Sequence, residues 1–142
     1  MQKHPMKVMV VDDDDVAQES VIRSLRKAGV CYELITANDG QEALNHLRGH
    51  TPGVQAEGSI IVLLDLNMPH MNGFEFLAEL RDDPALRATV VFVLTTSDSD
   101  TDRTRAYHQC IAGYMVKSSV GPQFSHLVRL LETYHAAIHL PI

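Results

Sequence analysis

Aspartates, a threonine and a lysine follow short apolar runs at four points along the sequence. Asp12 and Asp13 come directly after one run, and Asp65, Thr95 and Lys117 end or follow three others. Three carboxylates held close together repel one another unless a cation offsets them, and Mg²⁺ takes such oxygen ligands while keeping exchangeable waters. Aspartate is a competent nucleophile toward phosphorus, and a hydroxyl and an ammonium suit phosphoryl oxygens. Brought together, these side chains would form a device that accepts a phosphoryl group.

The elements that must position these side chains alternate between strands and helices. Five short apolar runs predict strands at 7–11, 31–37, 59–64, 89–94 and 112–116. Amphipathic stretches predict helices at 16–29, 39–49, 73–82, 100–110 and from 120 onward. Five β–α units in series favour a doubly wound α/β sheet with helices on both faces. The run at 59–64 is apolar at every position after its serine, which predicts a central strand buried on both sides.

The first predicted helix shows how its faces are assigned. Gly29 is its expected C-terminal stop and Asp15 its expected N-cap. Its inward residues are predicted to be Val16, Val21, Ile22, Leu25 and Ala28. The fourth helix, at 100–110, is polar and has few apolar anchors, which is typical of an element that shifts easily.

In an open parallel sheet, ligands sit beyond the carboxyl ends of the strands. The three acids, the threonine and the lysine all stand at such ends, so they are expected to converge on one small volume. Thr96 is expected only to leave that volume accessible. No Gly-rich loop of the P-loop or dinucleotide type is present, which argues against a bound nucleotide.

Composition narrows the class of protein. A chain of 142 residues fits one domain spanning 1–142, with a core at about 6–138 and short tails. The net charge of −6 argues against binding a nucleic-acid backbone. The two cysteines form no metal or disulfide pattern, and His46 and His50 are expected to be surface histidines. No apolar stretch approaches the roughly 20 residues that span a bilayer, and no signal peptide is evident, so a cytoplasmic protein without membrane contact is expected.

Four segments carry a resemblance to a known family. They are VVDDD at 10–14, LLDLNMPHMNG at 63–73, LTTS at 94–97 and GYMVK at 113–117. In this order and spacing they resemble the receiver domain of two-component response regulators. The resemblance covers residues 7 to about 138. It implies a flavodoxin-like fold with strand order 2-1-3-4-5 and five helices.

The resemblance also implies a phosphorylation site. Asp65 matches the phosphoacceptor, and Lys117 the lysine that pairs with phosphoryl oxygens. Asp13 matches the acid that binds Mg²⁺ (or Mn²⁺) directly, Asp12 the acid that acts mainly through water, and Asn67 the residue that offers its backbone carbonyl to the metal.

Two further positions match the family's switch. Thr95 corresponds to the hydroxyl that moves toward the phosphoryl group, and Tyr114 to the aromatic ring that turns inward with it. The sequence departs from the family at Ser118, where a proline in a cis peptide usually follows the lysine. A non-proline cis bond costs about 2.5–4 kcal/mol, so a trans bond is expected, and the reach of Lys117 depends on it.

For function, the resemblance implies a stand-alone response regulator that is phosphorylated by a sensor histidine kinase. The long loop at 50–58 and the TTSDSDTDR stretch at 95–103 resemble free-standing receivers that are paired with phytochrome-type kinases. It implies only self-phosphorylation and self-dephosphorylation chemistry rather than an enzyme. A phosphorelay intermediate that passes the group to a histidine phosphotransfer protein stays open as an alternative. A haloacid-dehalogenase-like phosphatase is disfavoured because its nucleophile follows the first strand. Helix four, strand five and helix five would form the partner-binding face and a candidate homodimer contact. Leu130, Tyr134 and Ile138 are candidate contact points on it, with membership of the core as the alternative for the same stripe.

Overall fold

The computed structural model describes residues 6–29, 33–50 and 59–141. Within them, five parallel strands form one sheet in the order β2-β1-β3-β4-β5. The strands are β1 (Met6–Val11), β2 (Glu33–Ala37), β3 (Ser59–Leu64), β4 (Val90–Thr95) and β5 (Gly113–Val116). The predicted fold class and strand order are therefore confirmed.

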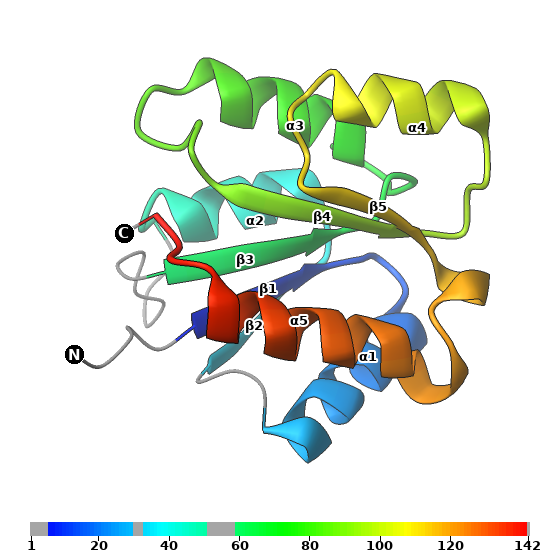
Figure 1. The fold of residues 1–142 in the computed structure, drawn as a ribbon. Coiled ribbons are helices and arrows are strands. Elements are labelled where there is room, and N and C mark those ends of the chain that lie inside the picture. The colour runs from blue at the N-terminus through cyan, green and yellow to red at the C-terminus, as the bar shows by residue number, and fades with distance from the viewer. Residues whose placement is uncertain (1–5, 30–32, 51–58, 142) are drawn as a thin grey trace.

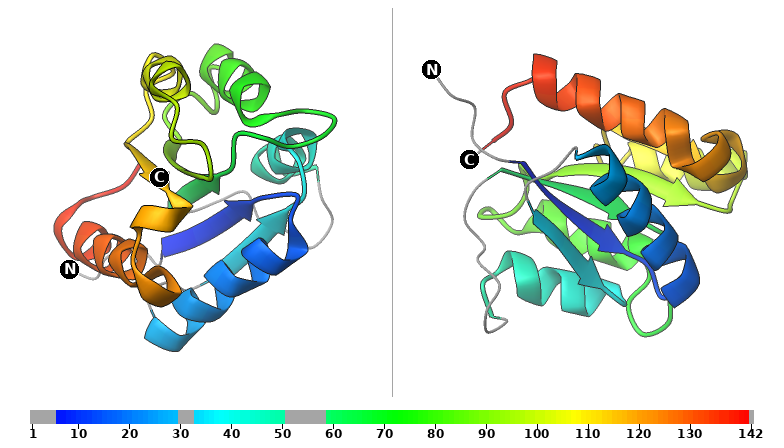
Figure 2. Two further views of the ribbon diagram at one scale, coloured as in Figure 1. Left: turned by 90° about the vertical axis from the view of Figure 1, so that its right-hand side faces the viewer. Right: turned by 90° about the horizontal axis from the view of Figure 1, so that it is seen from below.

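Five helices cover the sheet on both faces. They are α1 (Asp15–Ala28), α2 (Gly40–Leu47), α3 (Gly73–Asp82), α4 (Asp100–Tyr107) and α5 (Ser125–Ala137). Two single 3₁₀ turns, Lys117–Ser119 and Pro122–Phe124, join β5 to α5. Helices α1 and α5 lie on one face, and α2, α3 and α4 lie on the other (Figures 1 and 2). All five strands run in one direction, so their carboxyl ends share one edge of the sheet (Figure 1).

Two apolar cores lie on the two faces of the sheet. Alternate strand residues divide between them: Met9 and Val62 pack under α2 and α3, whereas Val8 and Leu63 pack under α1 and α5. Every residue of β1 is buried, and so is all of β3 except Ile60. Burial on both faces is what continuous apolar runs predict for central parallel strands, so this expectation is confirmed.

The start of α1 corrects one sequence-based prediction. The Asp14 carboxylate accepts hydrogen bonds from the N–H groups of Val16 and Ala17 at 3.0 and 3.3 Å, so Asp14 is the N-cap and Asp15 is the first helical residue. Gly29 ends the helix in the left-handed region, at φ 67°, as expected.

The inward face of α1 is also partly different from the prediction. Val21 and Leu25 are buried as predicted, but Val16 is 74% exposed. It lies two positions before the buried Gln18, which places it about 200° round the helix, on the opposite side. Ala28, in the last turn, is exposed as well.

Other element ends shift by a few residues. The predicted start of the second strand at 31 falls outside the described residues. Helix α2 begins one residue later than predicted because the Asp39 side chain caps it, accepting from the N–H of Glu42 at 2.8 Å. Helix α4 ends at Tyr107 rather than at 110, and α5 begins at Ser125 because Gly121, Pro122 and the positive φ of Gln123 interrupt a helix from 120. Among the described helices, none has the length and apolar character that crossing a membrane requires.

Candidate functional site

The three predicted acids meet at the carboxyl ends of β1 and β3. The two strands pair in register with Val11 beside Leu64, so the residues that follow them emerge side by side, and the Asp65 N–H donates to the Val11 carbonyl at 2.9 Å. One ligand oxygen from each of Asp12, Asp13 and Asp65 lies within 4.8 Å of the others. The convergence predicted from the sequence is therefore present.

Asp12 is the most constrained of the three acids. Its backbone N–H donates to the Ala37 carbonyl at the end of β2, at 3.0 Å. One carboxylate oxygen accepts from the Asp14 N–H at 2.9 Å, and the other accepts from Lys117 Nζ at 2.7 Å. Only 4% of the residue is exposed, whereas Asp13 beside it is exposed and free to reach solvent-side ligands.

A buried glutamine supports this turn. Gln18 Nε2 lies within hydrogen-bond range of three backbone carbonyls, those of Asp12 at 3.2 Å, Ala37 at 3.1 Å and Val10 at 3.5 Å. The side chain therefore ties α1 to the ends of β1 and β2. Sequence reasoning did not single out Gln18; its position one helical turn before Val21 is the signal that it faces inward.

Asp65 is held in a buried, charged environment. One carboxylate oxygen accepts from the Leu66 N–H at 2.8 Å, and the other lies 3.9 Å from Lys117 Nζ. Burial raises the pKa of Asp65 above its ordinary value, and the Asp12 carboxylate acts in the same direction. The Lys117 ammonium, the Thr95 hydroxyl and the Leu66 N–H lower the pKa but do not outweigh burial.

Gly73 makes room for the backbone at Asp65. A Cβ at this position would lie 2.6 Å from the Asp65 carbonyl oxygen and 2.8 Å from the Leu66 Cα. The Gly73 N–H also donates to the Leu66 carbonyl at 3.0 Å. The first turn of α3 therefore sits directly against the segment that carries Asp65, and only glycine permits that approach. Sequence reasoning assigned Gly73 no such role.

Thr95 and Lys117 lie next to these acids, at the strand ends where they were expected. Thr95 is the last residue of β4 and is fully buried, and its hydroxyl acts to lower the pKa of the Asp65 carboxyl. Lys117 opens the 3₁₀ turn after β5 and reaches both Asp12 and Asp65. The Lys117–Ser118 peptide is trans, as expected from the energetic cost of a non-proline cis bond. With the bond in this form, Lys117 still reaches both acids.

Three other residues named from the sequence lie on or just after these strands. The Asn67 side chain is exposed two residues beyond Asp65, and the predicted role of its carbonyl as a metal ligand stays a prediction. Tyr114 is half-buried on β5 and donates its hydroxyl to the Ser97 carbonyl at 2.9 Å. Thr96 is exposed at the site's rim.

The donor set fits a hard divalent cation. Three carboxylates offer oxygen ligands close together, and two of them are buried, where unbalanced negative charge is costly. Lys117 supplies one positive charge to Asp12 and Asp65, which leaves the trio with a net negative charge. Mg²⁺ and Mn²⁺ suit such oxygen ligands.

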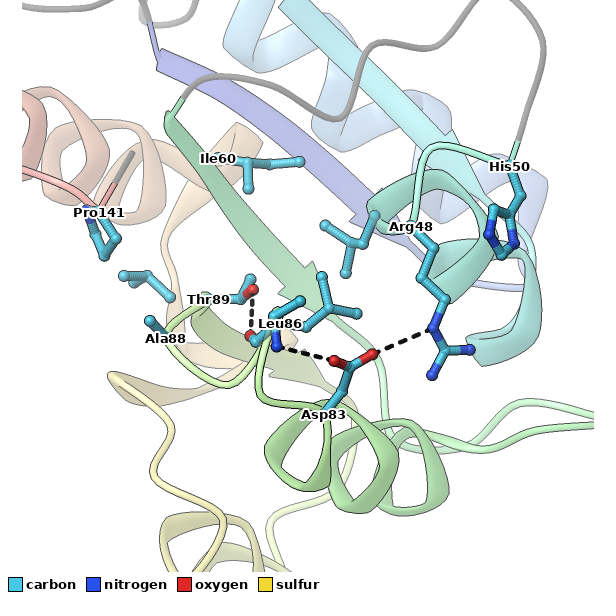
Figure 3. A pocket seen from close by; sticks show the side chains of 11 residues that line it. Arg48, His50, Ile60, Asp83, Leu86, Ala88, Thr89 and Pro141 are labelled. Atoms are coloured by element: carbon cyan, nitrogen blue, oxygen red, sulfur yellow. Dashed lines mark hydrogen bonds and ion pairs between the residues drawn. The ribbon is translucent and has the colours of Figure 1, made fainter.

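A separate pocket lies at the opposite edge of the sheet (Figure 3). It has a volume of about 450 Å³ and is lined in part by Arg48, Ile60, Asp83 and Pro141. Arg48 Nε lies 3.4 Å from Asp83 Oδ2, so the facing charges in the pocket offset one another (Figure 3). None of the predicted site residues lines it.

The histidine prediction is half right. His50 is exposed, as expected. His46 is buried, which contradicts the prediction of a surface residue, because its side of α2 packs on β2. Its Nε2 lies 3.0 Å from the Thr36 carbonyl and 3.6 Å from the Glu42 carboxylate.

A family model for the response regulator receiver domain matches residues 8–129. The chain belongs to this family: it is a phosphoacceptor response regulator with an acidic metal site, a signalling protein rather than a conventional enzyme.

Individual relatives agree with this assignment. The chain is 34% identical over 113 residues to the probable methanogenesis regulatory protein FilR2 of Methanothrix harundinacea, covering 80% of this chain and 72% of FilR2. It is 29% identical over 134 residues to response regulator Rcp1 of Synechocystis, covering 94% of this chain and 91% of Rcp1. The Mn²⁺-bound structure of Rcp1 superposes with a TM-score of 0.76 at 26% identity, over 97% of this chain and 100% of Rcp1. The phosphorylated cyanobacterial phytochrome response regulator RcpA superposes with a TM-score of 0.80 at 30% identity, over 98% and 99% of the two chains.

Proposed function

We propose that Asp65 is the phosphoacceptor of a stand-alone response regulator spanning 1–142. The observation that carries this proposal is the position of its buried carboxyl, flanked by the acids Asp12 and Asp13 and faced by Lys117 and Thr95. A carboxylate oxygen attacks the phosphorus of a phosphohistidine, the P–N bond breaks, and the imidazole leaves with the bonding electron pair and takes up a proton. The product is an acyl phosphate on Asp65.

Each neighbouring group has a task in this transfer. The Lys117 ammonium and the Thr95 hydroxyl hold phosphoryl oxygens, because both already face the Asp65 carboxyl. Asp13, Asp65 and the Asn67 carbonyl would hold Mg²⁺ or Mn²⁺, with Asp12 acting mainly through water. When bound, the cation supplies positive charge against the phosphoryl oxygens and the acids.

The modified aspartate then changes the balance between two conformations. Phosphorylation leaves about two negative charges on the modified side chain at neutral pH, in place of the single charge of the carboxylate, and these attract Lys117 and the Thr95 hydroxyl. Movement of Thr95 leaves space that the ring of Tyr114 fills, and the face formed by α4, β5 and α5 is altered for a partner. Phosphorylation favours this state only by interacting better with it than with the other.

The partner that donates the phosphoryl group to this chain, which we place in the cytoplasm, is proposed to be a sensor histidine kinase of phytochrome type. Similarity to the phytochrome response regulator RcpA supports this choice. A homodimer through the α4, β5 and α5 face is part of the proposal: Leu130 and Ile138 on α5 and its end are 37% and 42% exposed. Tyr134 contributes less to such a contact, because its ring packs edge-on against Phe92 at 5.4 Å.

Incubation with acetyl phosphate and Mg²⁺, followed by intact mass, tests the phosphoacceptor. The chain has no tryptophan, so mass serves better than quenching of intrinsic fluorescence. The wild type is expected to gain one phosphoryl group only when Mg²⁺ is present. Asp65→Asn is expected to gain none, whereas Asp98→Asn, which removes an exposed acid just beyond the site, gains as much as the wild type. Equal modification of Asp65→Asn and the wild type, or none of either, would contradict the proposal.

A further inference from the structure

Ser97 connects three different elements through its own polar groups. Its N–H donates to Thr95 Oγ1 at 3.3 Å, at the end of β4. Its carbonyl accepts from the Tyr114 hydroxyl on β5 at 2.9 Å. Its hydroxyl donates to Asp102 Oδ2 in the first turn of α4 at 2.7 Å. The residue two positions beyond Thr95 therefore links the acid site to α4 through a short, charge-assisted hydrogen bond.

This bond matters because α4 has few other attachments. Of its residues, Ala106 alone is buried, and the sequence DTDRTRAY has no apolar face to hold it on the sheet. Toward its C-terminal end, the Arg105 guanidinium lies 3.9 Å from the centre of the Phe74 ring, and the Tyr107 hydroxyl accepts from the Tyr114 N–H at 3.2 Å. At the N-terminal end, the Ser99 hydroxyl accepts from the Asp102 N–H, and the Asp102 carboxylate accepts from Ser97.

We infer that Asp102 is the residue through which the position of the Thr95 hydroxyl is transmitted to α4. This inference rests on the proposed function of the site. When the Thr95 hydroxyl shifts toward a phosphoryl group, the Ser97 N–H loses its acceptor. Ser97 then moves, and the Asp102 carboxylate, bonded to its hydroxyl, carries the first turn of α4 with it. Asp102 is thus a positioning residue for the response, not a participant in phosphoryl transfer.

Asp100 provides a matched control within the same turn. It is also an acid in the first turn of α4, where it interacts favourably with the helix dipole, and it is exposed. Its carboxylate pairs with Arg103 on the same helix. Asp100→Ala and Asp102→Ala therefore remove the same charge from the same turn, but only the second removes the bond to Ser97.

A double-mutant cycle followed by hydrogen exchange tests the inference without any phosphorylation. Thr95→Val removes the hydroxyl that accepts from Ser97, and exchange of the α4 amides is expected to rise several-fold. In the Asp102→Ala background, Thr95→Val is expected to change α4 exchange little, because the connection is already broken, while in the Asp100→Ala background its full effect remains. Additive effects of Thr95→Val and Asp102→Ala on α4 exchange would overturn the inference.

The phosphorylated protein gives a second, independent readout. Acetyl phosphate with Mg²⁺ is expected to change α4 exchange in the wild type, in Asp100→Ala and in Ser97→Thr, which keeps a hydroxyl. Ser97→Ala and Asp102→Ala are expected to lose most of that change while intact mass shows them still phosphorylated. An unchanged response in these two variants would overturn the inference. Absence of phosphorylation by mass in the wild type would instead count against the proposed function, and the cycle above decides the inference in that case.

Discussion

At the carboxyl edge of the sheet, the side formed by β1 and β3 differs from the side formed by β5 and α4 in how its residues are held. On one side, β1 and β3 are buried almost throughout, and the acids that follow them are held by Gln18, Leu66 and Lys117. On the other side, every residue of β5 is only partly buried, and α4 buries one residue. The acid site thus stands on rigid strands, while the adjoining segment is held by a few polar contacts.

This difference has a physical consequence for signalling. Side chains that must hold a cation and a phosphoryl group need fixed geometry, which packed central strands supply. An element that must respond to a new charge has to be near the low end of local stability, since each contact to be broken adds to the cost of moving. We therefore expect substitutions on the two sides to differ in how much they change stability and in how many elements they affect.

The largest effect is expected from the core beneath the acid site. Phe76 on α3 is fully buried, and Phe76→Ala should lower the free energy of unfolding by about 3–5 kcal/mol through lost burial and a residual cavity. Tyr107→Ala on α4, where the side chain is 48% exposed, should cost clearly less. Urea unfolding monitored by circular dichroism measures both. Similar losses for the two variants would contradict the contrast between the two sides.

Gly73→Ala should act on stability and on the site together. The new methyl would meet the Asp65 carbonyl oxygen, which is backbone and cannot turn away, so a loss of about 1–3 kcal/mol is expected. Because the Asp65 segment must shift, the rate of phosphorylation by acetyl phosphate should fall as well. Gly29→Ala is a useful contrast: nothing lies within 4 Å of the added Cβ, so any strain at its positive φ should leave phosphorylation unchanged. A wild-type rate in folded Gly73→Ala would show that this contact does not position Asp65.

Asp65→Asn should stabilise the unmodified protein in the absence of metal, and the gain should depend on pH. The folded-state pKa of Asp65 is raised, so the native protein binds its proton more tightly than the unfolded chain. The buried carboxylate therefore reduces stability as pH rises from its ordinary value of 3.8 through the folded pKa. The variant's Tm should exceed that of the wild type at pH 7 and approach it near pH 4. A gain independent of pH would show that relief of charge is not the cause.

The smallest effect is expected from the contact between α4 and α3. Arg105→Ala removes the guanidinium from the Phe74 ring, which at an exposed position is worth about 0.5–1 kcal/mol. Exchange of the α4 amides should rise while exchange in β1 and β3 stays unchanged. Arg105→Lys, which keeps the charge but not the planar group, should restore only part of the protection. Faster exchange in β1 or β3 would mean that α4 is not an independent unit.

Much of this architecture was predictable because it follows local rules. Apolar runs bounded by polar residues located all five strands, and the strand ends identified Asp12, Asp65 and Lys117 as neighbours. Parallel pairing places successive strand ends on one edge whatever the loops between them do. Helix ends were less predictable: Asp14 and Asp15 are equivalent as caps by residue type, and packing of α1 on the sheet decides between them.

The sequence by itself determined the chemistry of this protein: carboxylates, a hydroxyl and a lysine at parallel strand ends, in an α/β chain with a polar fourth helix. Tertiary structure alone decided how they are held. The pairing of Lys117 with Asp12, the buried amide of Gln18 and the bond from Ser97 to Asp102 join residues on separate elements or across a loop. Such contacts depend on the distance and orientation between packed elements, and no local pattern of residue types encodes these.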